Sequence, residues 1–249
     1  MFPLTKSIGE FIAGMRFEAV PGDVLPMIRN GFADYAGAVI LGRDTPIARL
    51  MKSVSSLSPQ GGEARVCFSH EGAAAGEAAL INGAAGHALD YDDVGLAAHP
   101  AHPTVVLASA ILAEGEALGA SGRDMIAAYV TGYEVWGELA IRDETPHHVK
   151  GWHPTGTFGA IAAGAACARL RDLDAGEAAH AIGIAASQAG GIVANYGSMT
   201  KPFHAGRAAQ SGVTAARLAG VGMTASADVI ENDKGFLKAV SPDGKVDLE

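Results

Sequence analysis

A chain of 249 residues that is 49% hydrophobic but only 6% aromatic, with 33 glycines, can bury one large core of small and aliphatic side chains, which favours helix packed on helix. The formal net charge of −9, without any run of five or six like charges, excludes the electrostatic footprint of a nucleic-acid-binding protein. The two cysteines, Cys67 and Cys167, are too few for a disulfide framework, so we expect a reducing cytoplasm.

The amino-terminal residues and the longest apolar stretches give no targeting or membrane signal. Met1–Met15 contains Lys6 and Glu10 instead of an unbroken apolar run, so no secretory signal is expected. Thr104–Leu112 and Thr157–Ala168 are too short to span a bilayer. We therefore expect a soluble, cytoplasmic protein that has no membrane partner.

The first half of the chain is predicted to be mainly helical. Apolar residues recur at helical spacing over Asp23–Leu41. An Ala-rich helix is predicted over Glu71–Asp90, although its glycines weaken it. Between these segments, Val66–Phe68 is the best strand candidate, and it is too short to define a sheet.

The second half carries stronger helix signals. Ser121 precedes Asp124 by three positions, which is the pattern of an N-cap with an acidic partner, and it predicts a helix over Gly122–Ala140. Asp174 and Glu177 repeat the pattern before another helix, predicted over Ala178–Ala189.

A last helix is predicted to begin after Pro202 and to end at Gly220. Taken together, these elements predict a mainly α fold. Residues 1–240 would form one large helical domain, and residues 241–249 would form a polar tail.

The most informative segment follows the Ala-rich helix. At helical spacing His87, Asp90 and Asp93 fall on one face, so a carboxylate could orient an imidazole ring. His99 and His102 each precede a proline, which favours an extended backbone and a rigidly presented ring. A polar helix end with solvated aspartates is the competing interpretation, and the two His-Pro pairs favour general acid–base chemistry over it.

The same segment could also be read as a metal site. Its candidate ligands are His87, Asp90, His99 and His102. However, the chain has no compact HExxH or Cys/His pattern. We therefore expect neither a metal nor another cofactor.

Two later segments place basic side chains around a proline that begins a helix. Pro154 suits the first helical position, so His153 is predicted at the N-cap beside free backbone N–H groups, where an anion would bind. Lys201, His204 and Arg207 recur at intervals of three, where their charge and the helix dipole would favour a carboxylate. The alternatives are a turn with a structural histidine and a solvated basic helix face.

Five phrases, in this order, carry a resemblance to a known family. They read NGAAGHALDYDDV, HPAHPT, GWHPTGTFG, SMTKPFHAGRAAQSG and ENDKGFL. The sequence that contains them resembles the MmgE/PrpD family from about residue 10 to about residue 240. Each phrase alone is modestly specific, but their shared order makes coincidence improbable.

The resemblance implies an active site between a large helical domain and a smaller α/β domain that this chain lacks, with no metal or iron–sulfur cluster. It places four residues at catalytic positions: Asp90, His102, His153 and Lys201. Four more are predicted to contact substrate: Asp93, His99, His204 and Arg207. The family motif often has Thr after the aspartate pair, where this chain has Val94.

The activity implied is proton transfer at a carbon next to a carboxylate, with Lys201 and His153 stabilising charge and His102 with Asp90 moving the proton. We expect a lyase, a dehydratase of 2-methylcitrate-like substrates, with decarboxylation or epimerisation as alternatives. A different alternative is a helical domain that only binds a small acid or oligomerises, and is inactive without a partner domain. The expected partners are a small polycarboxylate, a second copy in a homodimer, and a separate chain that supplies the smaller domain.

Overall fold

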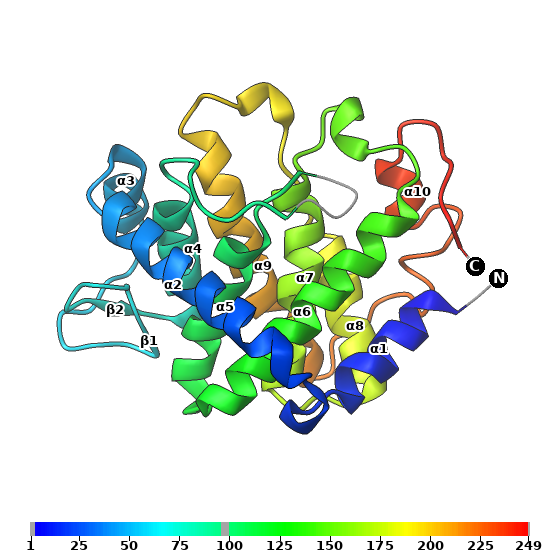
Figure 1. Cartoon of the computed structure of the whole chain (residues 1–249), viewed down its shortest axis with the longest axis horizontal. Coiled ribbons are helices and arrows are strands. Elements are labelled where there is room, and N and C mark those ends of the chain that lie inside the picture. Colours follow the sequence, from blue (N-terminus) through cyan, green and yellow to red (C-terminus); the bar gives the residue numbers. More distant parts are fainter. Residues whose placement is uncertain (1–2, 96–99, 249) are drawn as a thin grey trace.

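The computed structural model describes residues 3–95 and 100–248, and the fold is mainly α, as predicted (Figure 1). The described ranges contain ten α-helices: α1 (Leu4–Gly14), α2 (Leu25–Gly42), α3 (Pro46–Val54), α4 (Ala75–Gly86), α5 (Pro103–Leu118), α6 (Gly122–Arg142), α7 (Pro154–Leu170), α8 (Ala175–Ala186), α9 (Thr200–Gly220) and α10 (Phe236–Val240). None of these described helices combines the length and apolar character that crossing a membrane requires.

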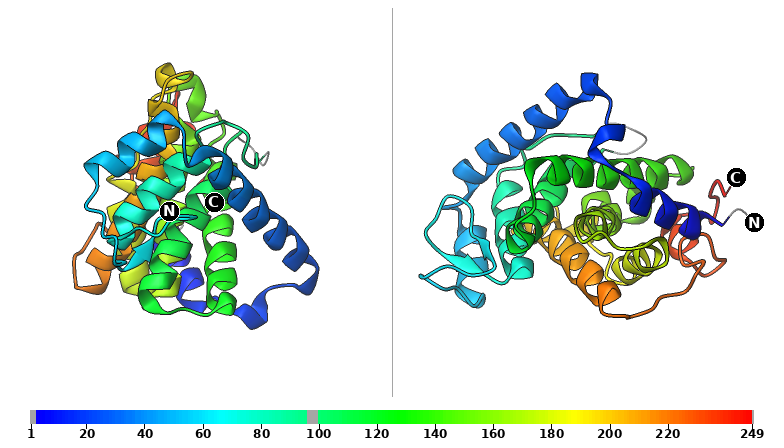
Figure 2. Two further views of the ribbon diagram at one scale, coloured as in Figure 1. Left: turned by 90° about the vertical axis from the view of Figure 1, so that its left-hand side faces the viewer. Right: turned by 90° about the horizontal axis from the view of Figure 1, so that it is seen from below.

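Helix α7 forms the centre of the bundle. Every residue from Pro154 to Ala168 is buried, and the helix packs against α5, α6, α8 and α9. In the right-hand view of Figure 2 it lies between α6 and α9. A helix that is buried on all sides needs neighbours on all sides, and the Ala and Gly residues of α7 allow their backbones to approach closely.

Local capping signals identified two helix N-caps, although α8 begins at Ala175 rather than at Ala178. Ser121 accepts a hydrogen bond from the Asp124 backbone at the start of α6, and Asp124 accepts one in return. Asp174 and Glu177 form the same reciprocal pair at the start of α8. Helix α9 begins at Thr200, slightly earlier than the predicted start after Pro202.

Two predictions in the first half were wrong. The strands are β1 (Ala64–Arg65) and β2 (Gly72–Ala73), an antiparallel pair, and Val66–Phe68 is not one of them. Phe68 has a φ of 57°, which takes the backbone out of the extended region. The Ala-rich helix α4 ends at Gly86 rather than at Asp90.

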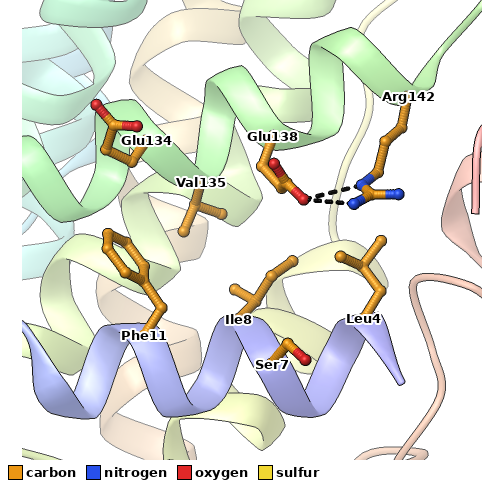
Figure 3. Close-up of a pocket in the computed structure, with 8 residues that line it drawn as sticks. All are labelled: Leu4, Ser7, Ile8, Phe11, Glu134, Val135, Glu138 and Arg142. Carbon is orange, nitrogen blue, oxygen red and sulfur yellow. Dashed lines mark hydrogen bonds and ion pairs between the residues drawn. The ribbon is translucent and has the colours of Figure 1, made fainter. Parts of the chain in front are cut away.

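An apolar groove lies between α1 and α6, with a charged pair at one end (Figure 3). Its apolar lining includes Ile8, Phe11 and Val135. At its end Glu138 accepts hydrogen bonds from two nitrogens of Arg142, at 2.9 and 2.7 Å. None of the predicted site residues that the structure describes lines this groove.

Residues 241–248, predicted as a polar tail, return to the end of α6. The Asp247 backbone N–H donates to the Arg142 carbonyl at 3.0 Å. Val246 and Leu248 are partly buried against the core. The described part of the tail is therefore packed on the helical domain.

Candidate active site

The loops that carry the predicted site residues lie at one end of the bundle. Figure 1 shows the segments that follow α4, precede α7 and precede α9 along its upper edge. Backbone hydrogen bonds join the last two, from His153 to Gly191 at 3.0 Å and from Val193 to Gly151 at 2.8 Å. Segments that are distant in sequence therefore meet at one place.

A buried carboxylate, Asp92, lies between two imidazole rings. The Nδ1 atom of His87 is 2.9 and 3.0 Å from the two carboxylate oxygens of Asp92. The Nδ1 atom of His102 is 3.4 Å from Asp92 Oδ2, which is an ion-pair distance. The His87 and His102 ring centroids are 4.5 Å apart.

This pairing corrects the helical-face prediction. His87 was expected to lie in the helix on one face with Asp90 and Asp93, but it is the C-cap residue of α4. Asp90 has a φ of 55°, a left-handed conformation that aspartate tolerates better than most residues. The chain turns there, and it is Asp92 that contacts the His87 ring.

Asp90 instead pairs with the predicted lysine. The Lys201 ammonium, near the start of α9, donates a hydrogen bond to Asp90 Oδ1. The same oxygen is 3.5 Å from Nε2 of His102. The ammonium also lies 5.1 Å from the ring centroid of Tyr196, a cation–π distance. Three of the four predicted catalytic residues therefore meet at one point.

The fourth, His153, is the N-cap residue of α7, as predicted. Its Nδ1 atom is 3.0 Å from Nδ1 of His204, so one ring donates and the other accepts. Gly191 has a φ of 122°, and a Cβ atom there would lie 3.2 Å from the His204 ring and 3.3 Å from the Cβ atom of His153. Glycine at this position thus lets the loop close over the histidine pair.

The remaining predicted residues are placed differently. Asp93 accepts hydrogen bonds from the backbone and hydroxyl of Thr104, at 3.2 and 2.7 Å, and so caps α5. Arg207 is exposed and bonds to Gln210 at 2.6 Å. His99 lies outside the described residues. The substrate contacts expected of Asp93, His99, His204 and Arg207 stay predictions.

Two cavities adjoin the Lys201 side chain. A cavity of about 210 Å³ is lined by Pro100, His102, His148, His153, Tyr196 and Lys201. A second, of about 370 Å³, includes Asp90 and Lys201 in its lining, together with the start of α3. Small acids would therefore have room on either side of the lysine.

Burial and charge shift the pKa values of the histidines in different directions. Burial alone would lower the pKa of His102, but its contact with Asp92 outweighs burial and raises that pKa above its usual value. Burial would raise the pKa of Asp92, yet His102 and His87 hold it well below its usual range. Burial lowers the pKa of His153 to about 2. Near neutral pH, Asp92 is an anion and His153 is neutral.

The site also contains a set of groups that could surround a cation. One ligand atom from each of His87, Asp90, Asp92 and His102 lies within 4.8 Å of the others. Asp90 already accepts a hydrogen bond from the Lys201 ammonium, and Asp92 already contacts the imidazole rings of His87 and His102. These contacts already occupy the carboxylate oxygens, and metal independence stays a prediction that a metal analysis can test.

Sequence reasoning missed Asp92, His148 and Tyr196. Asp92 lies in a quoted motif, but helical spacing pointed to its neighbours. His148 lies in a short 3-10 helix (His147–Lys150) before α7 and Tyr196 just precedes α9, and no local pattern marks them. Their only signal was nearness in sequence to His153 and Lys201.

Comparison with known proteins shows the family of this chain. The family model described as MmgE/PrpD N-terminal domain matches residues 6–249. A cis-aconitate decarboxylase from Homo sapiens is 30% identical in an alignment of 240 residues that covers 94% of this chain and 49% of that protein. A cis-aconitate decarboxylase from Aspergillus terreus is 28% identical over 251 residues, again 94% and 49%. The chain spans about half the length of these curated relatives, and it belongs to the MmgE/PrpD family, whose N-terminal domain it matches.

Proposed function

We propose that this chain carries the acid–base and carboxylate-binding groups of a lyase that acts on a small polycarboxylate without a metal or other cofactor. The observation that supports this is the meeting of an imidazole and an ammonium at one carboxylate: His102 Nε2 and Lys201 Nζ both contact Asp90 beside a cavity. The curated relatives named cis-aconitate decarboxylases favour decarboxylation as the first reaction to test, before dehydration of a 2-methylcitrate-like acid.

Decarboxylation of cis-aconitate sets clear demands on such a site. The bond between the CH2 carbon and its carboxylate breaks, CO2 leaves, and the electron pair of that bond forms a new double bond to the central carbon. The π electron pair of the former double bond takes up a proton at the CH carbon, the end of that bond farther from the CH2 group. One proton is gained and one CO2 is lost, so the site must supply an acid and hold the remaining carboxylates.

We assign the acid to His102, because its contact with Asp92 favours the protonated ring. Lys201, held by Asp90, would meet a substrate carboxylate. His153 stays neutral, and it can donate from Nε2 when its Nδ1 accepts from His204. Dehydration would use the same groups to remove a proton beside a carboxylate and to protonate the leaving hydroxyl.

The test is an NMR assay of the purified, EDTA-treated chain with cis-aconitate and, separately, with 2-methylcitrate. We expect cis-aconitate to be consumed with release of CO2. His102→Gln and Lys201→Met should each lower the rate by about a hundredfold or more. The matched controls are His70→Gln and Lys6→Met, because both side chains are exposed and line none of the site cavities.

Wild-type rates in both site variants would reject this assignment, and activity that requires added zinc would reject metal independence. If no turnover is seen, titration of each acid into 15N-labelled chain separates the alternatives. Binding that Lys201→Met abolishes would support a domain that holds a small acid and needs further groups for chemistry. Failure to bind either acid would reject the proposed function.

A further inference from the structure

Asp92 is the most deeply buried carboxylate at the site, and the roles assigned above give it no step of its own. Its side chain is 1% exposed, whereas that of Asp90 is 56% exposed. An ionised carboxylate that is removed from water is stable only where hydrogen-bond donors satisfy it. The donors within reach are the ring nitrogens of His87 and His102.

This geometry dictates which nitrogen of His102 carries a proton. A carboxylate only accepts hydrogen bonds, so a ring nitrogen can hydrogen-bond to it only when that nitrogen is protonated. Among the described residues, Nδ1 of His102 is buried and has no hydrogen-bond partner nearer than Asp92 Oδ2 at 3.4 Å. Nε2 of His102 lies 3.5 Å from Asp90 Oδ1, but that oxygen already accepts a hydrogen bond from Lys201 and the Asp90 side chain is 56% exposed, whereas the buried Asp92 depends on its imidazole donors. The neutral ring therefore keeps its proton on Nδ1 and its lone pair on Nε2.

His87 holds the other side of Asp92. Its side chain is 0% exposed, and burial lowers its pKa despite the adjacent carboxylate. It therefore stays neutral and donates one N–H to Asp92 without neutralising its charge. The proton that this charge attracts goes to His102, whose side chain is 13% exposed and less strongly desolvated.

We propose that Asp92 is a positioning residue that holds His102 with Nδ1–H toward the buried carboxylate and Nε2 toward Asp90, and that His87 fixes Asp92 in this orientation. The benefit for catalysis rests on the proposed proton-transfer role of His102, whereas the tautomer and the orientation do not. The charged and titratable groups near His102 are Asp90, Asp92, Lys201, His87 and His153. Lys201 disfavours a proton on His102, and the two aspartates favour it.

The direct test is long-range 1H–15N correlation NMR of the full chain with 15N-labelled histidine and no substrate. A His102→Gln spectrum identifies the signals of His102. In the wild type we expect the neutral ring to carry its proton on Nδ1. Asp92→Asn should lower the pKa of His102 by about one unit or more and give a mixture of its two tautomers. Asp92→Glu should retain most of the raised pKa and most of the Nδ1–H tautomer.

Asp143→Asn is the matched control, because Asp143 and His147 form another buried Asp–His pair, with an Nδ1 to Oδ2 distance of 2.6 Å. This variant should leave the tautomer of His102 unchanged even where it lowers stability. It separates the loss of any buried Asp–His bond from the specific effect on His102.

A wild-type neutral ring protonated on Nε2 would overturn the proposal, even if Asp92→Asn failed to fold. So would an unchanged tautomer and pKa of His102 in a folded Asp92→Asn chain. Where turnover is measurable, Asp92→Asn should lower kcat by about tenfold or more and leave KM within about twofold, because it acts on the proton donor and not on substrate binding. An inactive wild type with the Nδ1–H tautomer would uphold the positioning role and count only against the proposed function.

Discussion

At the scale of single residues, Glu114 ties three helical segments together inside the protein. Its side chain is 0% exposed and contacts Arg171 at 2.5 Å and Arg217 at 2.8 Å. Arg217 also bonds to Glu63 at 2.8 Å. The carboxylate on α5 thus joins α9 to the end of α7, so its charge is needed where two guanidinium groups converge.

Replacing this carboxylate should be costly. Glu114→Gln keeps the shape but leaves two partly buried arginines without their shared anion, so we expect a loss of about 3 kcal/mol in the free energy of unfolding. Urea denaturation measures it. Glu10→Gln makes the same chemical change in an exposed pair with Lys6 and should cost less than about 1 kcal/mol. Equal losses in the free energy of unfolding in the two variants would show that the buried network stabilises the chain no more than an exposed ion pair does.

At the scale of elements, the crossing of α4 and α9 brings two backbones into direct contact. A Cβ atom built on Gly206 would lie 2.2 Å from the Leu80 carbonyl oxygen, and one on Gly83 would lie 2.7 Å from Gly206 Cα. Backbone atoms cannot move aside as flexible side chains do. This crossing also determines where α9 presents Lys201 to the site.

Gly206→Ala should therefore lower the free energy of unfolding by about 2–3 kcal/mol, because the two helices must separate. Gly137→Ala is the matched control in α6, where a new Cβ meets nothing within 4 Å. It should stabilise the chain by about 0.5–1 kcal/mol, since alanine favours helix. A shift of both urea midpoints in the same direction would contradict the close crossing.

At the scale of the whole molecule, the buried histidines link stability to pH. Burial lowers the pKa of His87, His153 and His204, so their contribution to stability is full above the unfolded value of about 6.5 and is lost as pH falls below it. His102, whose pKa is raised, acts in the opposite sense and loses its contribution as pH rises. Three groups oppose one, so the folded chain binds fewer protons than the unfolded chain.

We expect the free energy of unfolding to fall between pH 7.5 and pH 5.5, by up to about 1.4 kcal/mol per pH unit for each proton by which the two states differ. Urea denaturation at three pH values in this interval measures the slope. His153→Gln removes one of the three groups and should make the slope shallower. A stability that is constant or rises toward pH 5.5 would show that these rings are protonated in the folded chain.

Much of the helical framework was predictable from the sequence because its signals are local. A cap such as Ser121 with Asp124 is complete within one helical turn, and Pro154 fixes the first position of α7 by its own ring. The five family phrases likewise lie within short segments, and the family match confirms them. Sequence alone therefore determined the mainly α fold, two of the capped starts and the family.

The pairing of side chains across the site was decided by the tertiary structure. A left-handed backbone at Asp90 turns the chain so that Asp92, and not its neighbours, contacts His87. His153 and His204 are far apart in the chain and meet only because α7 and α9 begin side by side. Periodicity describes one element at a time, whereas a buried hydrogen bond between elements depends on how loops and helices pack. The sequence therefore identified most of the chemical groups of the site, and the tertiary structure determined which of them pair.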